Sequence, residues 1–182
     1  MQSNTTTIGG QPAARCLQKG ETMSGFTHID EQGQVRMVDV THKKPSLRIA
    51  VARGFIFMTP ATLENILNQS VKKGNVLETA RIAGIMGAKR TSGLIPMCHP
   101  LNITHIQIDF APDKPRNAIE IIAQVRILDQ TGVEMEALTA VSIAALTIYD
   151  MCKSYDRAMV ISDIALIEKS GGKSGHFKRT EV

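Results

Sequence analysis

Two alternating stretches on either side of a short turn constrain the fold more than any other feature of this sequence. Apolar and polar residues alternate from 104 to 110, and a longer stretch rich in Ile and Val follows from 118 to 128. Pro112 and Pro115 lie between the two stretches and favour a turn. The pattern predicts a β-hairpin, and with it an antiparallel sheet.

Helical segments interrupt the strands in an order that indicates the fold class. Thr59 and Pro60 are typical of a helix start, and Asn75 with Glu78 resembles a capping box. The predicted elements are strands at 35–40 and 47–58, helices at 60–71 and 75–90, the hairpin, a helix at 137–154 and a strand at 159–169. This order predicts an α+β fold, in which helices pack on one face of an antiparallel sheet.

Length and composition fit one folded domain. Of the 182 residues 43% are apolar, and no apolar run reaches the roughly 18 residues of a membrane span. We expect a disordered extension at 1–25, a single domain at 26–177 and a basic tail at 178–182. The helix at 137–154 is apolar on almost all sides, which indicates burial and contacts with another subunit.

Charge and cysteine content narrow the class of partner. The net charge of +4 is mild, Trp is absent and aromatic residues make up only 4%, which argues against stacking on single-stranded nucleic acid. A small anionic ligand fits this charge equally well. Three cysteines without a CxxC pair favour a reduced, cytoplasmic setting.

Acidic residues mark both ends of the apolar helix. Glu134 and Glu136 share a face if 132–136 is extended, where they could hold a ring rich in N–H donors, although an acidic helix start explains the same pair without any ligand. Asp150 and Lys153 share a helix face. Because Asp150 follows an apolar run, it is either a general base with a raised pKa or half of a structural ion pair with Lys153.

Other polar residues suggest an anion site. His99, between prolines in a loop, could hydrogen-bond a ligand or simply be exposed, and no further ligands stand at metal-binding spacing. The glycine-rich stretch 170–175 lacks the Walker spacing but could cradle an anion. Cations at element ends could converge on a polyphosphate: Lys72, Lys73, Lys89, Arg90, Lys153, Lys169 and Lys173.

Eight motifs in one order carry a family resemblance. They are MVDV at 37–40, KGNV at 73–76, TARIAGI at 79–85, AKRT at 88–91, LIPMCHPL at 94–101, GVEMEALT at 132–139, ALTIYDMCK at 145–153 and KSGGKSG at 169–175. From about 26 to 177 the chain resembles the MoaC-type cyclic pyranopterin monophosphate synthase family. Asn75 and His176 stand where the family more often has acidic residues, and neither position is catalytic.

The resemblance implies a ferredoxin-like subunit, a homohexamer built as a trimer of dimers, and active sites at the dimer interface. It implies a lyase of molybdenum cofactor biosynthesis that converts (8S)-3′,8-cyclo-7,8-dihydroguanosine 5′-triphosphate to cyclic pyranopterin monophosphate and pyrophosphate. Such an enzyme would need no cofactor and would bind neither nucleic acid nor a membrane, although Mg²⁺ could accompany the triphosphate.

The resemblance also assigns residues. The family's catalytic aspartate falls on Asp150, and its acid–base and phosphate-binding lysines fall on Lys73, Lys89, Lys153 and Lys169. Its substrate-contacting positions fall on Met97, Cys98, His99, Glu134, Met135, Glu136 and Asp39. Two alternatives stand beside this reading: a catalytically silent relative, which should have lost Asp150, Lys73 or Lys169, and an RNA-binding module that uses the basic tail.

Overall fold

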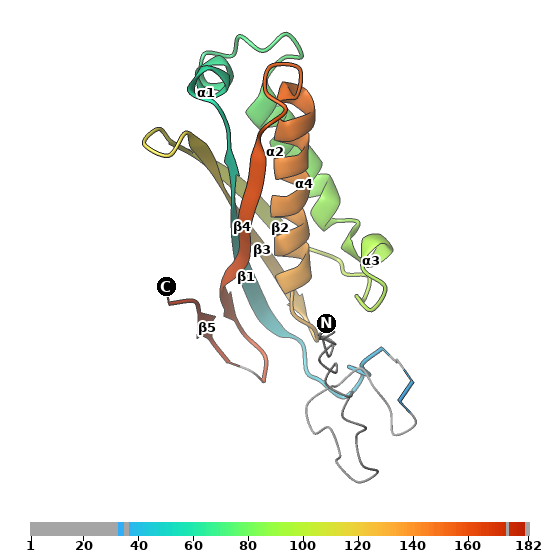
Figure 1. Ribbon diagram of the computed structural model, residues 1–182. Helices are drawn as coiled ribbons and strands as arrows, with labels where there is room; N and C mark the ends of the chain where they lie inside the picture. Colours follow the sequence, from blue (N-terminus) through green and yellow to red (C-terminus); the bar gives the residue numbers. More distant parts are fainter. Residues whose placement is uncertain (1–32, 35–36, 174, 181–182) are drawn as a thin grey trace, which may run out of the picture. The chain divides into compact units, whose positions relative to one another are not determined.

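The computed structural model describes residues 33–34, 37–173 and 175–180. The chain divides into a unit at 1–36 and a unit at 37–182, and the fold is that of the second unit (Figure 1). The extension predicted at 1–25 lies outside the described residues. The elements are β1 (Ser46–Phe57), α1 (Pro60–Leu67), α2 (Val76–Ala88), α3 (Thr91–Leu94), β2 (His105–Asp113), β3 (Ala118–Asp129), α4 (Glu134–Cys152), β4 (Val160–Ser170) and β5 (Phe177–Lys178).

The strands form one antiparallel sheet in the order β2-β3-β1-β4-β5. The predicted hairpin is confirmed as β2 and β3, whose connection includes Asn117 at a φ of 51°. Near the end of β1, Ile56 stands opposite Ile119 of β3 and Ile161 of β4, so β1 pairs with a strand on each side. The β1 strand is therefore the central element against which the helices pack.

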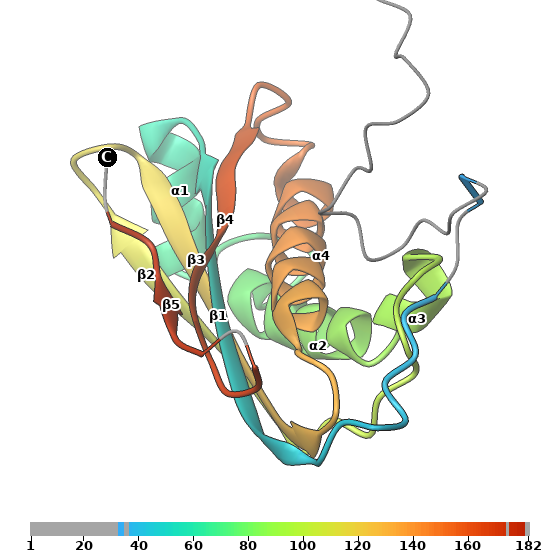
Figure 2. The ribbon, with the colours of Figure 1, turned by 90° about the horizontal axis from the view of Figure 1, so that it is seen from below.

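The helices α2 and α4 cover one face of this sheet (Figure 2). On β1 the residues that face α4, among them Ala50, Ala52 and Ile56, are fully buried. Gly54 lets the helix approach, because a Cβ at this position would lie 2.7 Å from Cγ1 of Val141. The predicted fold class is confirmed: an α+β fold, consistent with the ferredoxin-like arrangement, with the core between the sheet and α4.

Several predicted boundaries are wrong. Residues 37–40 are not a strand, because the chain turns where Lys43 N donates to Val40 O and does not join the sheet. The helix expected at 60–71 ends at Leu67, just before Gln69 adopts a left-handed φ of 54°. The short elements α3 and β5 have no clear pattern of their own and were not predicted.

The helix α4 begins three residues earlier than expected and is buried on one side only. By length and composition alone it could cross a membrane, but half of it is buried inside the molecule, as in the core helix of a folded domain. On its outward side Leu146 is 54% exposed and Met135 is 37% exposed. The prediction that α4 is buried on all sides is therefore wrong within a single chain.

Candidate active site

Three of the predicted catalytic residues meet at the C-terminal end of α4. Lys153 Nζ lies 2.7 Å from Asp150 Oδ1, and Lys73 Nζ lies 3.2 Å from Asp150 Oδ2. Lys73 also donates to the backbone oxygen of Asp150 at 2.7 Å. We call Lys73, Asp150 and Lys153 the C-terminal cluster.

The electrostatics of the C-terminal cluster correct one expectation. The side chain of Asp150 is 60% exposed, because it lies on the outward side of α4 and not among the apolar residues that precede it. Hydrogen bonds from Lys153 and then Lys73 lower its pKa. The predicted raised pKa is therefore wrong, and the alternative of an ion pair with Lys153 is confirmed, with Lys73 as a second partner.

Local structure holds Lys73 in place. Val71 is buried, and Gly74 closes a turn by donating to Val71 O with a φ of 99° that suits glycine. The backbone nitrogen of Lys72 donates to Tyr155 Oη at 3.1 Å, which ties this turn to the segment after α4. The α2 helix then starts at once, with Asn75 accepting from the nitrogen of Glu78 as the capping pattern predicts.

A second group of predicted residues meets at the N-terminal end of α4. Lys169 Nζ of β4 lies 3.2 Å from Glu134 Oε1, and both side chains are mostly buried. Glu136 is only 4% exposed, and burial, with a smaller effect from the charge of Glu134, raises its pKa to about 7. Burial and the negative charge of Glu136 raise the pKa of the Cys98 thiol. We call Glu134, Glu136, Lys169 and Cys98 the N-terminal cluster.

Glu134 and Glu136 do not share a face, because the segment is the first turn of α4 and not a strand. Residues two apart on a helix point in widely different directions, so Glu134 reaches Lys169 while Glu136 is buried. The alternative explanation of this pair, an acidic first turn of a helix, therefore describes its position correctly. The two carboxylates nevertheless differ sharply in burial, which a merely solvated helix start does not explain.

The other predicted residues have fewer described contacts. Met97 and His99 flank Cys98 in the loop after α3 and are half-buried, whereas Lys89 is exposed at the end of α2. Asp39 is exposed, and its carboxylate accepts from the hydroxyl and backbone nitrogen of Thr41, which lower its pKa. The assignment of these residues to the substrate stays a prediction.

The two clusters do not meet within one chain. Glu134 and Asp150 are sixteen residues apart on one continuous helix, which corresponds to about 24 Å at ~1.5 Å per residue. In Figure 1 this helix runs alongside β1 and β4. A substrate the size of a nucleotide cannot contact both clusters of a single chain.

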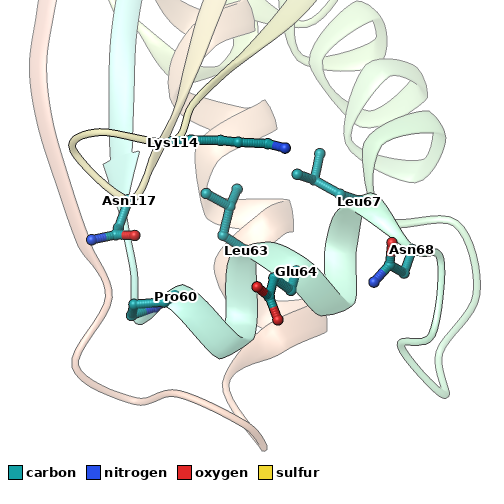
Figure 3. Close-up of a pocket in the computed structure, with 7 residues that line it drawn as sticks. All are labelled: Pro60, Leu63, Glu64, Leu67, Asn68, Lys114 and Asn117. Atoms are coloured by element: carbon teal, nitrogen blue, oxygen red, sulfur yellow. The ribbon is translucent and has the colours of Figure 1, made fainter.

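A cavity beside α1 is a poor candidate for the site. It has a volume of about 520 Å³ and lies between α1 and the β2–β3 turn, with Leu63 and Leu67 on its floor (Figure 3). Its charged lining residues are Glu64 and Lys114, one of each sign. None of the predicted site residues is among those described as lining it.

The sequence analysis did not single out two residues that the structure shows to be important for local geometry, Gly132 and Arg48. Gly132 leaves space for the Glu134 side chain, because a Cβ at Gly132 would collide with the Glu134 carboxylate. Arg48 donates to the backbone oxygens of Asp129 and Gln130 at 2.9 and 2.7 Å, which fixes the start of β1 to the end of β3. Gly132 lay inside a recognised motif, whereas Arg48 had no distinguishing pattern.

Comparisons with known proteins agree with the motif order. The model of the MoaC family matches residues 37–172. A protein of Desulforapulum autotrophicum named cyclic pyranopterin monophosphate synthase is 65% identical over 155 residues, which cover 85% of this chain and 95% of that protein. Proteins of the same name from Desulfatibacillum aliphaticivorans and Magnetococcus marinus are 61% and 58% identical, over 85% and 86% of this chain and 98% and 96% of their own lengths.

Proposed function

The chain belongs to the MoaC family, and from that premise we propose that it is a cyclic pyranopterin monophosphate synthase. The enzyme is a lyase of molybdenum cofactor biosynthesis. It converts (8S)-3′,8-cyclo-7,8-dihydroguanosine 5′-triphosphate to cyclic pyranopterin monophosphate and pyrophosphate. The observation that supports this most directly is an ionised carboxylate, Asp150, held between the ammonium groups of Lys73 and Lys153.

The chemistry of the reaction suits these groups. Rebuilding a guanine-derived ring as a pterin requires proton transfers, and the ammonium groups of Lys73 and Lys153, held in position by the Asp150 carboxylate, can donate protons. In the phosphate step a ribose hydroxyl oxygen bonds to the α-phosphorus, the bond from that phosphorus to the bridging oxygen breaks, and pyrophosphate leaves. The hydroxyl proton passes to a base, and cations stabilise the charge on the leaving group.

Glu136 adds a group that changes protonation near neutral pH. With its pKa raised to about 7, a substantial fraction of the side chain is protonated at pH 7. A neutral carboxyl can donate a hydrogen bond to a ring carbonyl, and the ionised form can accept from a ring N–H. We assign the ring to Glu134 and Glu136, with Met135, Met97, Cys98 and His99 around it.

The 24 Å between the two clusters leads us to a site shared by two subunits. The outward side of α4 carries, in order, Met135, Ser142, Leu146 and Asp150, and Ser142 lies midway between the two end residues. Two copies of α4 packed antiparallel about a two-fold axis near Ser142 would bring Asp150 beside Met135 of the partner subunit. Each dimer would then contain two complete sites, each built from one cluster of each subunit.

The surface beside α4 favours the same arrangement. Ile82 and Met86 lie one helical turn apart on the outer side of α2 and are 60% and 47% exposed. The helices α2 and α4 pack closely, because Gly84 has no Cβ and Ala140 O lies 2.8 Å from where one would be. Leu146 of α4 is a further exposed apolar residue, and subunit interfaces commonly cover such side chains. We propose the homohexamer, a trimer of dimers, on this basis.

The remaining expectations concern ions, macromolecules and compartment. Within residues 37–173 and 175–180 no group of three His, Cys, Asp or Glu side chains converges as a set of metal ligands. We propose that the enzyme has no resident cofactor and that Mg²⁺, where used, arrives on the triphosphate. We further propose a cytoplasmic enzyme that acts on a small molecule and binds neither nucleic acid nor a membrane.

The test supplies the cyclised dihydro-GTP, or couples the protein to the enzyme that makes it, and follows pyrophosphate release. The wild type should release one pyrophosphate per substrate, and Lys73→Ala should lose about 100-fold or more of this activity. Lys72→Ala is the matched control, since Lys72 is also an exposed lysine and contributes only its backbone nitrogen to the turn. No pyrophosphate from the wild type would reject the proposed activity, and normal turnover in Lys73→Ala would remove Lys73 from the catalytic residues.

A further inference from the structure

A tyrosine hydroxyl contacts the backbone next to Lys73. The connection between α1 and α2 passes the C-terminal end of α4, where the backbone nitrogen of Lys72 donates to Tyr155 Oη at 3.1 Å. In the same turn, Lys73 Nζ donates to the backbone oxygen of Asp150 at 2.7 Å and to its Oδ2 at 3.2 Å. The turn that carries Lys73 is therefore attached to the end of α4 at two points, one through its backbone and one through the Lys73 side chain.

Tyr155 extends from a turn that is itself fixed. Its backbone nitrogen and that of Asp156 donate to Cys152 O at 2.8 and 3.1 Å, which holds the chain against the last residue of α4. The side chain of Asp156 is buried, and its carboxylate accepts from the backbone nitrogens of Thr59 and Ala158. The position of the phenol is thus determined by α4 and by the start of α1.

The stretch that carries Lys73 lies outside the core. Residues 72–75 are exposed, between Val71 and Val76, which are both buried. A lysine side chain is a flexible four-carbon stem, so a shift of its backbone changes which oxygens the ammonium group can reach. The Tyr155 hydroxyl therefore limits the movement of the backbone from which Lys73 extends.

We propose that Tyr155 is a positioning residue for Lys73. The proposal rests on the proposed function for the role of Lys73 in the reaction. Water can replace the phenol as the acceptor for the exposed Lys72 nitrogen, so this hydrogen bond contributes little to the stability of the fold. A water molecule is not attached to α4, however, and does not fix the Lys73 backbone relative to Asp150. Because a displacement of about 1 Å can lower a rate about 100-fold, loss of the phenol oxygen should reduce turnover more than stability.

The reactivity of the Lys73 amine tests this positioning without any substrate. Competitive acetylation of the full chain with acetic anhydride, read by mass spectrometry, compares Lys73 with the exposed Lys114 as an internal reference. In Tyr155→Phe the Lys73 ammonium should leave the Asp150 oxygens more often. The acetylation of Lys73 relative to Lys114 should therefore rise about 3-fold or more over the wild type.

Ser70→Ala is the matched control. The Ser70 hydroxyl donates to the backbone oxygen and Oδ1 of Asn65, so the variant removes an exposed side-chain hydrogen bond of the same connection and keeps the Tyr155 contact. Both Tyr155→Phe and Ser70→Ala should lower the Tm by about 4 °C or less. Only Tyr155→Phe should change the ratio of Lys73 to Lys114 acetylation.

Turnover of the cyclised nucleotide separates positioning from a structural role. In Tyr155→Phe kcat should fall about 10-fold and KM should stay within about 2-fold of the wild type, because every charge of the C-terminal cluster is kept. An unchanged acetylation ratio in Tyr155→Phe, an equal rise in Ser70→Ala, or a wild-type kcat in Tyr155→Phe would overturn the inference. A raised Lys73 reactivity in Tyr155→Phe without any turnover by the wild type would instead reject the proposed reaction and leave Tyr155 as the group that positions Lys73.

Discussion

The two ends of α4 carry the same kinds of group, carboxylates beside lysines, in opposite environments. At the C-terminal end Asp150 is 60% exposed and its pKa is lowered by Lys153 and Lys73. At the N-terminal end Glu136 is 4% exposed and its pKa is raised to about 7. One end is therefore a fixed ion cluster open to solvent, and the other is a protected site whose protonation changes near neutral pH.

The helix dipole alone would produce the reverse pattern. An N-terminus favours an ionised carboxylate and a C-terminus disfavours one. Burial outweighs the dipole at Glu136, and two ammonium groups outweigh it at Asp150. The comparison shows that neighbouring atoms, and not the helix dipole, decide the protonation state of these carboxylates.

The largest expected effect tests whether one site uses both ends. Asp150→Asn and Glu136→Gln should each lower turnover about 100-fold or more, because the first removes the charge that positions Lys73 and Lys153 and the second removes a group that changes protonation near neutral pH. Oligomers co-assembled from equal amounts of the two variants should regain about a quarter of wild-type activity, since half of the dimers are mixed and one of their two sites is intact. Activity is measured as pyrophosphate release.

No rescue in these mixed oligomers, with mixing confirmed by two affinity tags, would show that the clusters serve separate sites. Circular dichroism should confirm that Asp150→Asn keeps its fold, because the residue is exposed.

A smaller effect is expected from the surface between the two ends. Leu146→Glu places a charge in the middle of the outward side of α4 and should shift the oligomer towards monomers at micromolar concentration, with a loss of about 10-fold in activity. Sedimentation measures the oligomeric state. Ala61→Glu, at an exposed position of α1, is the control. An unchanged oligomer in Leu146→Glu would place the subunit contact elsewhere.

The pH dependence of the free energy of unfolding tests the burial of Glu136 at the N-terminal end of α4. The folded protein binds the Glu136 proton more tightly than the unfolded chain does, so the free energy of unfolding should fall as pH rises from 4.5 to about 7. Glu136→Gln should remove a fall of roughly 3 kcal/mol and leave stability at low pH almost unchanged. Urea unfolding at a series of pH values measures this, and equal pH dependence in both proteins would contradict the burial of an ionisable Glu136.

The smallest effect concerns the space around Glu134. Gly132→Ala should displace the Glu134 carboxylate from Lys169 and raise KM about 3-fold to 10-fold, with a stability change below about 1 kcal/mol. Gly93→Ala is the control, because its Cβ would meet nothing within 4 Å. A KM unchanged by Gly132→Ala would mean that the Glu134–Lys169 pair does not position the substrate.

Much of the fold follows from local patterns. The hairpin, the capped start of α2 and the length of α4 were visible because their periods and caps involve residues a few positions apart. Of the strand expected at 35–40, the described residues 37–40 are not a strand, because strand formation needs a partner and an alternating pattern does not say whether a partner is present. The motifs implied that Lys73, Asp150 and Lys153 act together; the structure shows that their side chains are in contact, and their role in catalysis stays a prediction.

The apolar helix with acidic residues at both ends was already determined by the sequence. Which of those carboxylates is buried was decided only by the tertiary structure, because burial depends on segments far away in the chain, such as the loop around Cys98 that approaches Glu136. The same holds for the contact between Arg48 and the glycine-rich loop, which exists because this loop folds back onto β1. Local order determines helices and strands, but a pKa near neutrality arises from contacts between them.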